Sequence, residues 1–443
     1  MSKFTYSWGN NSIFLFGCGG ISMSAIAEYL LYKGFSVFGY DKQRSREVRK
    51  LESKGMRFLH PKELSDLSAV VIYTSAVENT EDFMRLKALG FRLIKRSLAI
   101  SEIQSRYKFN IAVSGSHGKT TSTAMLAHVL KCAHKHPTAF IGGHDSEFGN
   151  LLIGGNRVCV TEACEFRANF LDLRKNVAIV LNVDNDHLDS YGSFGNLKKS
   201  FCEFAKNSIA VINADDEKSN GIVGKKTVTF GIKKTADYTA KDIIFTEETT
   251  FKVFYRGRYK AEITLNTSGI HNVYNALAVI ASARVYKISW KNIREGLIDF
   301  TGVKRRSEVI GSIGGVVAVC DYAHHPTEVK ATLSGFTEDT LVVFQPHTYS
   351  RTKILMSEFV DALKNVKHLA LYKTYSAREK YKKEGSAETL YRTLIPVAKH
   401  NVFYLKNIKQ LKEIITSCKG IKKVAFIGAG NIYDIALKLI DKK

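Results

Sequence analysis

The strongest signal in this chain is the stretch Ile111-Ala112-Val113-Ser114-Gly115-Ser116-His117-Gly118-Lys119-Thr120-Thr121. Its first half predicts a buried β-strand, and its second half predicts a glycine turn that opens a helix. In such a turn, backbone N–H groups point at phosphate oxygens and the helix N-terminus adds the positive end of its dipole. The lysine reaches the β- and γ-phosphates, and the first threonine hydroxyl binds Mg²⁺. The stretch therefore predicts an ATP-binding loop made of Gly115, Ser116, His117, Gly118, Lys119, Thr120 and Thr121.

This loop is shorter than the common phosphate-binding motif. That motif places its first glycine five residues before the second, and Val113 holds this position here. Gly115 gives the form Gly-x-x-Gly-Lys-Thr-Thr instead. The alternative interpretation is a glycine turn that only caps a helix. The order of strand, glycine turn, Gly-Lys-Thr-Thr and amphipathic helix favours phosphate binding.

Length and composition set the broad class of the protein. The chain has 443 residues, of which 45% are hydrophobic and 24% charged, as is typical of a globular protein with two or three domains. No apolar run approaches a membrane span, and Ile13-Phe14-Leu15-Phe16 is too short for the core of a signal peptide. The seven scattered cysteines lack metal-ligand spacing and indicate reduced thiols. These features predict a cytoplasmic protein without membrane insertion.

The formal net charge of +23 would suit a polyanionic partner. The basic residues, however, are scattered in short pairs, and the one denser run, Lys380 to Lys383, is flanked by glutamates. The sequence has no basic arm and no basic stripe with interleaved aromatic residues. We therefore favour a solvated basic surface and anionic small substrates over nucleic-acid binding.

Strand and helix patterns alternate in three blocks, which begin at residue 12, at Phe109 and near Arg305. The first block has the order of a Rossmann-like fold. A helix is expected at 22–33 and another around 271–286. We expect strands at 12–16, 36–40, 69–74, 92–94, 109–114, 157–161, 177–183, 209–212, 227–231, 315–320, 341–344, 368–371, 401–405 and 423–427, with β-rich structure at 251–265.

A second glycine turn follows the first expected strand. Gly17 and Gly19 match the dinucleotide fingerprint, but Ser22 replaces its third glycine. Gly20 completes the turn, and Asp41 ends the second strand, where a ribose-binding carboxylate belongs. The pattern favours a nucleotide or nucleotide-sugar site, although the motif alone does not exclude a nicotinamide cofactor.

Acidic residues end the next two strands of the central block. Glu162 and Glu165 follow one strand, and the run at 184–189, which includes His187, follows the next. Because the carboxyl ends of parallel strands meet at one edge of a sheet, these groups are expected beside the glycine loop. There they would hold Mg²⁺ or position phosphate. The alternative is helix capping by the aspartates and a surface histidine.

Three further stretches carry polar residues at predicted element ends. Residues 269–276 open a helix and could read an adenine edge, although an N-cap and a polar helix face explain them more simply. Residues 321–328 and 344–351 are rich in His, Pro and hydroxyl groups and suggest half of a composite site. Zinc is disfavoured because adjacent histidines do not easily face one metal and no cysteine pair assists them.

Together these motifs resemble the Mur ligases of peptidoglycan synthesis, in order and over nearly the whole chain. The short glycine loop is the form found in this family. Ser22, Cys320 and Ala323 depart from its pattern. The resemblance rests on residues 17–24, 115–121, 162–165, 182–189, 271–275, 302–306, 321–328, 344–352, 375–379 and 428–432.

The resemblance implies three α/β domains. A Rossmann-like domain at 1–106 would bind the UDP-sugar, a central P-loop ATPase domain at 107–303 would bind ATP, and a Rossmann-like domain at 304–443 would bind the amino acid. It implies an ATP- and Mg²⁺-dependent ligase of cell-wall biogenesis that joins L-alanine to the carboxylate of UDP-N-acetylmuramate through an acyl phosphate. A monomer or weak dimer is expected.

The resemblance also assigns residues. Lys119 and Thr120 would serve ATP and Mg²⁺, and Glu165 and His187 would serve a second Mg²⁺, with Glu162 as the alternative. The remaining assignments are Asn272 and Asn275 at adenine, Asp321 near the ribose, Gly17, Gly19, Gly20, Ser22, Asp41 and His325 at the substrate, and Arg305 or Arg306, His347 and Arg351 at the sugar carboxylate, acyl phosphate or amino acid.

Three other functions remain open at this stage. The first is a related ligase that adds a peptide to UDP-muramic acid, or glutamate to folate. The second is a nucleotide-binding homologue without catalysis. The third is an oxidoreductase that uses the first glycine turn.

Overall fold

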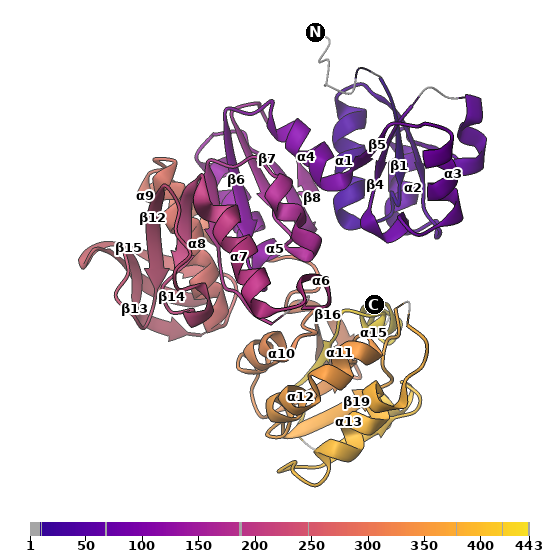
Figure 1. Ribbon diagram of the computed structural model, residues 1–443. Helices are drawn as coiled ribbons and strands as arrows, with labels where there is room; N and C mark the ends of the chain where they lie inside the picture. Colours follow the sequence, from indigo (N-terminus) through magenta and orange to yellow (C-terminus); the bar gives the residue numbers. More distant parts are fainter. Residues whose placement is uncertain are drawn as a thin grey trace. The chain divides into compact units, whose positions relative to one another are not determined.

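The computed structural model describes residues 9, 11–66, 69–185, 188–246, 248–377, 379–418 and 420–441. The chain divides into two compact units, Met1–Asn266 with Asn272–Thr301, and Thr267–His271 with Gly302–Lys443. Each unit is built from twisted sheets with helices packed on their faces (Figure 1). Within the described ranges, no helix is both long and apolar enough to cross a membrane.

The first unit begins with a five-stranded parallel sheet in the order β3-β2-β1-β4-β5. The order reverses between β1 and β4, and in such sheets ligands bind at the carboxyl ends beside this switch point. Its strands are β1 (Ser12–Phe16), β2 (Ser36–Tyr40), β3 (Arg57–Phe58), β4 (Val70–Tyr73) and β5 (Leu93–Lys95). Its helices are α1 (Ile21–Tyr32), α2 (Arg46–Ser53), α3 (Glu81–Ala88) and α4 (Arg96–Gln104), with 3₁₀ turns η1 (Pro61–Asp66) and η2 (Ser75–Val77).

The same unit continues into a ten-stranded sheet in the order β15-β14-β13-β12-β11-β10-β6-β9-β7-β8. The strands from β13 to β7 in this order run parallel, and β8, β14 and β15 are antiparallel additions. The strands are β6 (Phe109–Ser114), β7 (Thr138–Asp145), β8 (Gly149–Leu152), β9 (Val158–Glu162), β10 (Val177–Val180), β11 (Ile209–Asn213), β12 (Lys226–Gly231), β13 (Tyr238–Phe245), β14 (Thr249–Tyr255) and β15 (Arg258–Leu265).

Helices cover this ten-stranded sheet. They are α5 (Lys119–Cys132), α6 (Leu188–Tyr191), α7 (Phe194–Lys206), α8 (Ile270–Val285) and α9 (Trp290–Asp299), with 3₁₀ turns η3 (Phe166–Asp172) and η4 (Glu217–Ser219). One apolar cluster joins the two sheets of the unit, because Tyr29 of α1 packs on Phe140 of β7 with ring centroids 5.7 Å apart. The middle strands are buried on both faces, as parallel strands covered by helices usually are.

The second unit holds a six-stranded sheet in the order β16-β17-β21-β18-β19-β20, in which only β16 is antiparallel to its neighbour. Its strands are β16 (Glu308–Ile313), β17 (Val316–Asp321), β18 (Thr340–Phe344), β19 (His368–Tyr372), β20 (Val402–Leu405) and β21 (Lys423–Ile427). Its helices are α10 (Pro326–Leu333), α11 (Tyr349–Ile354), α12 (Met356–Leu363), α13 (Ala387–Leu394), α14 (Gln410–Ser417) and α15 (Ile432–Leu437), with the 3₁₀ turn η5 (Lys383–Gly385).

Each expected strand is present, with ends that differ by a few residues. The strand expected at 177–183 ends at Val180: the Leu181 N–H still donates to Ser114 at the end of β6, but the Asn182 carbonyl accepts from the Ser116 N–H of the glycine loop. The structure adds β3, β7, β8, β13 and β16, which were not expected. The α/β fold with three sheets agrees with the sequence-based prediction.

Candidate active site

The glycine loop connects β6 to α5 at the carboxyl edge of the central sheet. Gly118 is the N-cap of α5 and has φ of 83°, a left-handed conformation that glycine adopts without strain. A Cβ at this position would lie 2.4 Å from Oδ1 of Asn275. Gly115 has φ of 136°, and a Cβ there would lie 3.0 Å from Cβ of Leu181. The two glycines thus allow a loop that lies tightly against its neighbours.

Asn182 holds the path of this loop from the segment that follows β10. The Ser116 N–H donates to the Asn182 carbonyl oxygen at 3.1 Å, and the His117 N–H donates to Asn182 Oδ1 at 2.8 Å. The Asn182 side-chain amide donates back to the His117 carbonyl at 3.1 Å. Asp184 adds a backbone N–H bond to the Ser116 hydroxyl at 2.7 Å. A single amide side chain therefore fixes the loop from both sides.

Lys119 is held inside the loop by its ammonium group. Its Nζ donates to the carbonyls of Gly115 at 2.5 Å and Ser116 at 3.0 Å, and it lies 3.0 Å from the Glu165 carboxylate. Burial alone lowers the pKa of Lys119, but the Glu165 carboxylate, with smaller contributions from Cys164 and Glu162, outweighs this effect and the net result is a raised pKa. The lysine is therefore charged at neutral pH and lies in a buried anionic setting.

Glu162 is the carboxylate beside the first threonine of the loop. The Thr120 hydroxyl donates to Glu162 Oε2 at 2.8 Å, and the Gly142 N–H donates to the same oxygen at 2.9 Å. The pairing of Val113 with Glu162 between β6 and β9 sets this register. A Cβ on Gly142 would lie 2.1 Å from the carboxylate, so a glycine is required at this point of β7.

Glu165 lies in the turn after β9 and is only 1% exposed. Its backbone carbonyl accepts a hydrogen bond from the Tyr191 hydroxyl, which in turn accepts from the Ala168 N–H at 3.2 Å. Arg167 and Ala168 have φ of 51° and 57°, left-handed values that cost free energy for residues with a side chain. The turn is thus held in a strained form that directs Glu165 to the lysine of the loop.

Asn272 and Asn275 lie on the first turns of α8. Both are buried, and Nδ2 of Asn275 donates to Oδ1 of Asn272 at 3.3 Å. Asn275 faces Gly118, as its close approach to that position indicates. Tyr274, between them, donates its hydroxyl to Asp215 at 2.8 Å. The two amides therefore lie next to the glycine loop.

The first glycine turn follows β1. Gly17 has φ of 90°, and a Cβ there would lie 2.5 Å from Cγ2 of Thr74. Its N–H donates to the Tyr40 carbonyl at 2.8 Å. The turn is therefore anchored between β2 and the end of β4, at the switch point of the sheet.

Asp41 braces this turn from the end of β2. The Gly19 N–H donates to Asp41 Oδ2 at 2.9 Å. Gly20 is the N-cap of α1, and the half-buried Ser22 lies in the first turn of that helix. A helix N-terminus thus begins directly at the turn, which is an arrangement suited to anions.

In the second unit, Arg305 is held by its own surroundings. Its Nη2 donates to the carbonyls of Gly428 at 3.3 Å and Gly430 at 2.9 Å. Its guanidinium carbon lies 4.7 Å from the Tyr322 ring centroid and 5.3 Å from that of Tyr433. Arg305 therefore orders the loops at the carboxyl ends of β17 and β21.

Arg306 lies 5.3 Å from the Tyr322 ring centroid, and its Nη1 is 3.9 Å from the Glu328 carboxylate. His325 is the N-cap of α10, and its Nδ1 accepts the Thr327 N–H at 3.4 Å. Arg306 is the less constrained of the two adjacent arginines. His325 has a clear structural role as a helix cap.

Asp321 ends β17 and is buried. Its carboxylate accepts from the N–H groups of Ser307 and Ala323, both at 2.8 Å, and from the Thr332 hydroxyl at 3.2 Å. These bonds tie the start of the second unit to β17 and α10.

His347 and Arg351 lie on the loop and helix after β18. The His347 ring stacks on Tyr375 with centroids 5.6 Å apart, and its Nδ1 is 3.2 Å from Arg351 Nη1. Because arginine only donates, this His347 nitrogen is the acceptor and Nε2 carries the proton. Burial, then the neighbouring His324 and Arg351, lower the pKa of His347 to about 4, so the ring is neutral at physiological pH.

Three family models match successive stretches of the chain. Residues 13–108 match the Mur ligase family catalytic domain, 113–283 the Mur ligase middle domain, and 305–430 the Mur ligase glutamate ligase domain. The chain is 36% identical over 448 residues to UDP-N-acetylmuramate–L-alanine ligase of Caldanaerobacter subterraneus, with 97% of each chain covered. The chain belongs to the Mur ligase family.

Two further relatives support this assignment. UDP-N-acetylmuramate–L-alanine ligase of Clostridium kluyveri is 38% identical over 449 residues, with 96% of this chain and 97% of the relative covered. The crystal structure of UDP-N-acetylmuramate-alanine ligase from Thermotoga maritima superposes with a TM-score of 0.83 at 28% identity, over 97% of this chain and 98% of that one. The Mur ligase fold therefore extends along the whole chain.

The Mur ligase resemblance assigned Glu165 and His187 as ligands of a second Mg²⁺, with Glu162 as the alternative. The structure brings Glu162 to Thr120 and Glu165 to Lys119. His187 lies outside the described residues. Sequence reasoning did not name Asn182 as a site residue, although its place directly after a strand next to the glycine loop is a usable signal.

Proposed function

We propose that this Mur ligase is an ATP-dependent UDP-N-acetylmuramate–L-alanine ligase of cytoplasmic peptidoglycan precursor synthesis. The observation that carries the proposal is the full-length similarity to relatives of that name, at 36% and 38% identity with no large uncovered segment. We assign the UDP-sugar to residues 1–106, ATP to 107–303 and the amino acid to 304–443.

The proposed reaction explains why the glycine loop carries a buried positive charge. A carboxylate oxygen of the sugar attacks the γ-phosphorus of ATP, ADP leaves, and an acyl phosphate forms. Both reactants are anions, so their approach must be offset by positive charge. Lys119, charged and enclosed by the loop, is suited to that role, because a buried ammonium interacts more strongly with phosphate than an exposed one.

The second half of the reaction forms the amide. The amino nitrogen of L-alanine attacks the acyl carbon, inorganic phosphate leaves, and a proton is lost from nitrogen. We propose that Arg306, His347 and Arg351 of the second unit bind anionic groups of these reactants. His347 would donate through Nε2 and not act as a base, because its lowered pKa and its contact with Arg351 keep it neutral and oriented.

The residues around Thr120 fit a magnesium site. Its hydroxyl and the Glu162 carboxylate are hard oxygen donors 2.8 Å apart, which suit Mg²⁺ better than a softer metal. Bound Mg²⁺ would neutralise phosphate charge. We propose Thr120 and Glu162 as one ligand pair, and Glu165 with His187 for a second ion.

Inorganic phosphate release by the purified full-length chain tests this proposal. Release should require ATP, UDP-N-acetylmuramate and L-alanine together, and Lys119→Ala should abolish it without a change in the far-ultraviolet circular dichroism spectrum. A panel of L-alanine, L-serine, glycine, L-glutamate and a tripeptide, with folate as a second acceptor, separates the related ligases. Turnover only with the tripeptide, only with folate and glutamate, or with no combination would overturn the assignment.

A further inference from the structure

A second pocket lies at the far edge of the central sheet from the glycine loop. We call it the basic pocket. It has a volume of about 530 Å³ and is lined by Tyr32, residues 134–136 and residues 153–157. The loop at 134–136 precedes β7 and the loop at 153–157 precedes β9, whereas the glycine loop follows β6. Helix α5 spans the two edges, and its 14 residues correspond to about 20 Å. The basic pocket is therefore separate from the ATP-binding loop.

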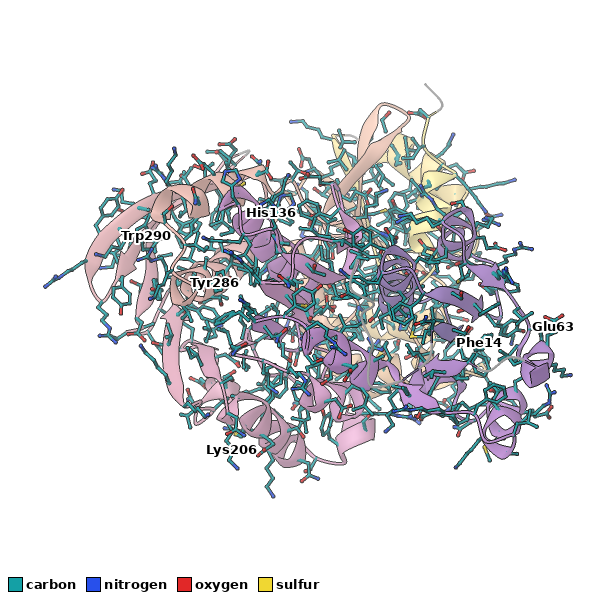
Figure 2. All side chains as sticks on the ribbon, turned by 90° about the horizontal axis from the view of Figure 1, so that it is seen from above. Phe14, Glu63, His136, Lys206, Tyr286 and Trp290 are labelled. Carbon is teal, nitrogen blue, oxygen red and sulfur yellow. The ribbon has the colours of Figure 1, made fainter. Side chains whose placement is uncertain are left out.

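The walls of the basic pocket are fixed by backbone contacts. The Gly155 N–H donates to the His136 carbonyl at 2.7 Å, and the Gly154 N–H donates to the Thr138 hydroxyl at 3.1 Å. A Cβ on Gly154 would lie 2.2 Å from the His136 carbonyl oxygen, so the two loops approach as closely as glycine allows. Figure 2 marks His136 in the first of these loops. The pocket is thus preformed, which lowers the entropic cost of binding.

The charged groups of the lining are all basic. Lys135 and Arg157 carry full positive charges, His134 and His136 add two imidazoles, and no carboxylate is among the lining residues. Basic residues commonly compensate the negative end of a helix dipole. At the end of α5, however, the carbonyls of Leu130 and Lys131 are satisfied by backbone N–H groups of the following turn. Arg157 precedes a strand, so helix capping does not explain it.

The two histidines occupy backbone positions where glycine is the usual residue. His134 and His136 have φ of 52° and 47°, left-handed values that are uncommon for residues with a side chain, although His adopts them more often than most. His134 directly follows the C-cap of α5, where helices often end with a left-handed residue. The left-handed backbone at both positions brings two imidazoles to the lining of the pocket.

Tyr32 provides a flat apolar surface at the mouth of the pocket. It ends α1 and is 63% exposed, which is unusual for a large ring. Lys33 Nζ lies 5.1 Å from its ring centroid, and the exposed Asn156 lies on the facing loop. An aromatic ring with nearby amide and basic groups suits a ligand that joins a planar base to a phosphate.

We propose that the basic pocket binds a nucleoside phosphate, with the phosphate at Lys135 and Arg157 and the base against Tyr32. The volume falls in the usual range for small-molecule sites. This proposal concerns a surface outside the catalytic machinery and does not rest on the proposed ligase activity.

Hydrogen–deuterium exchange of the full-length protein tests the proposal, because it locates binding along the chain. The probes are ADP, UDP and inorganic pyrophosphate at matched ionic strength. Peptides covering 131–138 and 152–158 report the basic pocket, and those covering 113–121 report the glycine loop independently. ADP or UDP should protect the basic-pocket peptides more strongly than pyrophosphate does.

Variants separate a built site from a generally basic surface. Lys135→Ala with Arg157→Ala should raise the nucleotide concentration for half-protection by about tenfold or more. As a control, the double variant Lys199→Ala with Lys206→Ala removes the same charge from exposed positions of α7. It should leave the nucleotide concentration for half-protection unchanged. His134→Gly relieves the strained backbone, so it should keep the fold and still weaken binding.

Three results would overturn the proposal. The first is the absence of protection at 131–138 and 152–158 at nucleotide concentrations that protect 113–121. The second is equal loss of protection in both double variants, which would indicate a general charge effect. The third is pyrophosphate acting as well as the nucleotides, which would remove the role of the base. Failure of the ligase proposal would instead appear at peptides 113–121 and in the turnover assay.

Discussion

His128 is a buried charged residue whose removal should destabilise the first unit. It lies on α5 and is 1% exposed. Its Nδ1 is 2.8 Å from Asp299 Oδ2, and its Nε2 is 3.2 Å from Asp145 Oδ2. Carboxylates only accept hydrogen bonds, so both ring nitrogens donate and the ring is an imidazolium. Burial lowers the pKa of His128, but the two carboxylates outweigh it and raise the pKa overall.

The magnitude follows from the burial of the two partners. The Asp145 side chain is fully buried, and breaking a buried pair from one side costs about 3–5 kcal/mol. The N–H groups of Glu147 and Phe148 still donate to Asp145 Oδ1, so the lower end of this range applies. Asp299 is 42% exposed, so its contact adds at most about 1 kcal/mol. Lys131 and Glu147 also face the cluster, and the lysine compensates part of the loss. We therefore expect His128→Gln to cost about 3 kcal/mol, a fall of about 6–12 °C in the melting temperature of this unit.

The pH dependence has a definite sign. The folded-state pKa of His128 lies above its unfolded value of about 6.5, so the stabilising contribution is complete below that pH. It is lost as the pH rises through the folded-state pKa. The difference in unfolding free energy between the wild type and His128→Gln should therefore be larger at pH 6 than in alkaline buffer.

Urea unfolding followed by circular dichroism at several pH values measures this difference. His144→Gln is the matched control, because His144 is a neighbouring, half-buried histidine that pairs with Glu47 at 3.2 Å and should cost less than about 1 kcal/mol. Asp145→Asn combined with His128→Gln should recover part of the loss, since the uncompensated charge is removed. Two results would refute the assignment of His128 as a buried imidazolium. One is a cost below about 1 kcal/mol for His128→Gln, and the other is a stability difference between wild type and variant that grows towards alkaline pH.

Three further predictions concern the proposed active site. Lys119→Ala should lower ATP-dependent phosphate release by about a thousandfold or more at a temperature where the far-ultraviolet circular dichroism spectrum shows the variant still folded, because its loss also leaves the buried Glu165 carboxylate unpaired and lowers stability; near-normal turnover would refute its role at the phosphates. Glu162→Gln should raise the Mg²⁺ concentration for half-maximal turnover more than Glu165→Gln does, because Glu162 bonds to Thr120. If a Mg²⁺ titration gives the reverse order, Glu165 and not Glu162 is the ligand that acts with Thr120. Gly19→Val should weaken UDP-N-acetylmuramate binding in calorimetry, because a Cβ there lies 3.0 Å from the Asp41 carboxylate, and binding of NAD in place of the UDP-sugar would contradict the nucleotide-sugar site.

Elements with strong local signals were predicted well. The apolar run of β6, the glycine turn and α5 follow each other as the sequence indicates, because burial periodicity and glycine conformation act over a few residues. The expectation that α5 is amphipathic is wrong, since 122–130 are all buried and the helix is covered on every side. The hairpin of β7 and β8 was not expected. The apolar run at 138–141 is interrupted by Gly142 and Gly143, which weaken a strand pattern. Only the folded sheet shows that Gly142 is needed for the approach of the Glu162 carboxylate.

The sequence by itself determined the α/β class, the glycine loop between a strand and a helix, and the family, since these depend on local patterns and on their order along the chain. It narrowed the acidic residues beside the loop to Glu162 and Glu165 but did not separate them, because they lie three residues apart at a strand end. The tertiary structure separates their contacts: the register of β9 on β6 brings Glu162 to Thr120, and the strained turn after β9 brings Glu165 to Lys119. Asn182 reaches the glycine loop for the same reason, since β10 pairs with β6. Pairing between distant strands is a long-range property, and no local pattern in the chain specifies it.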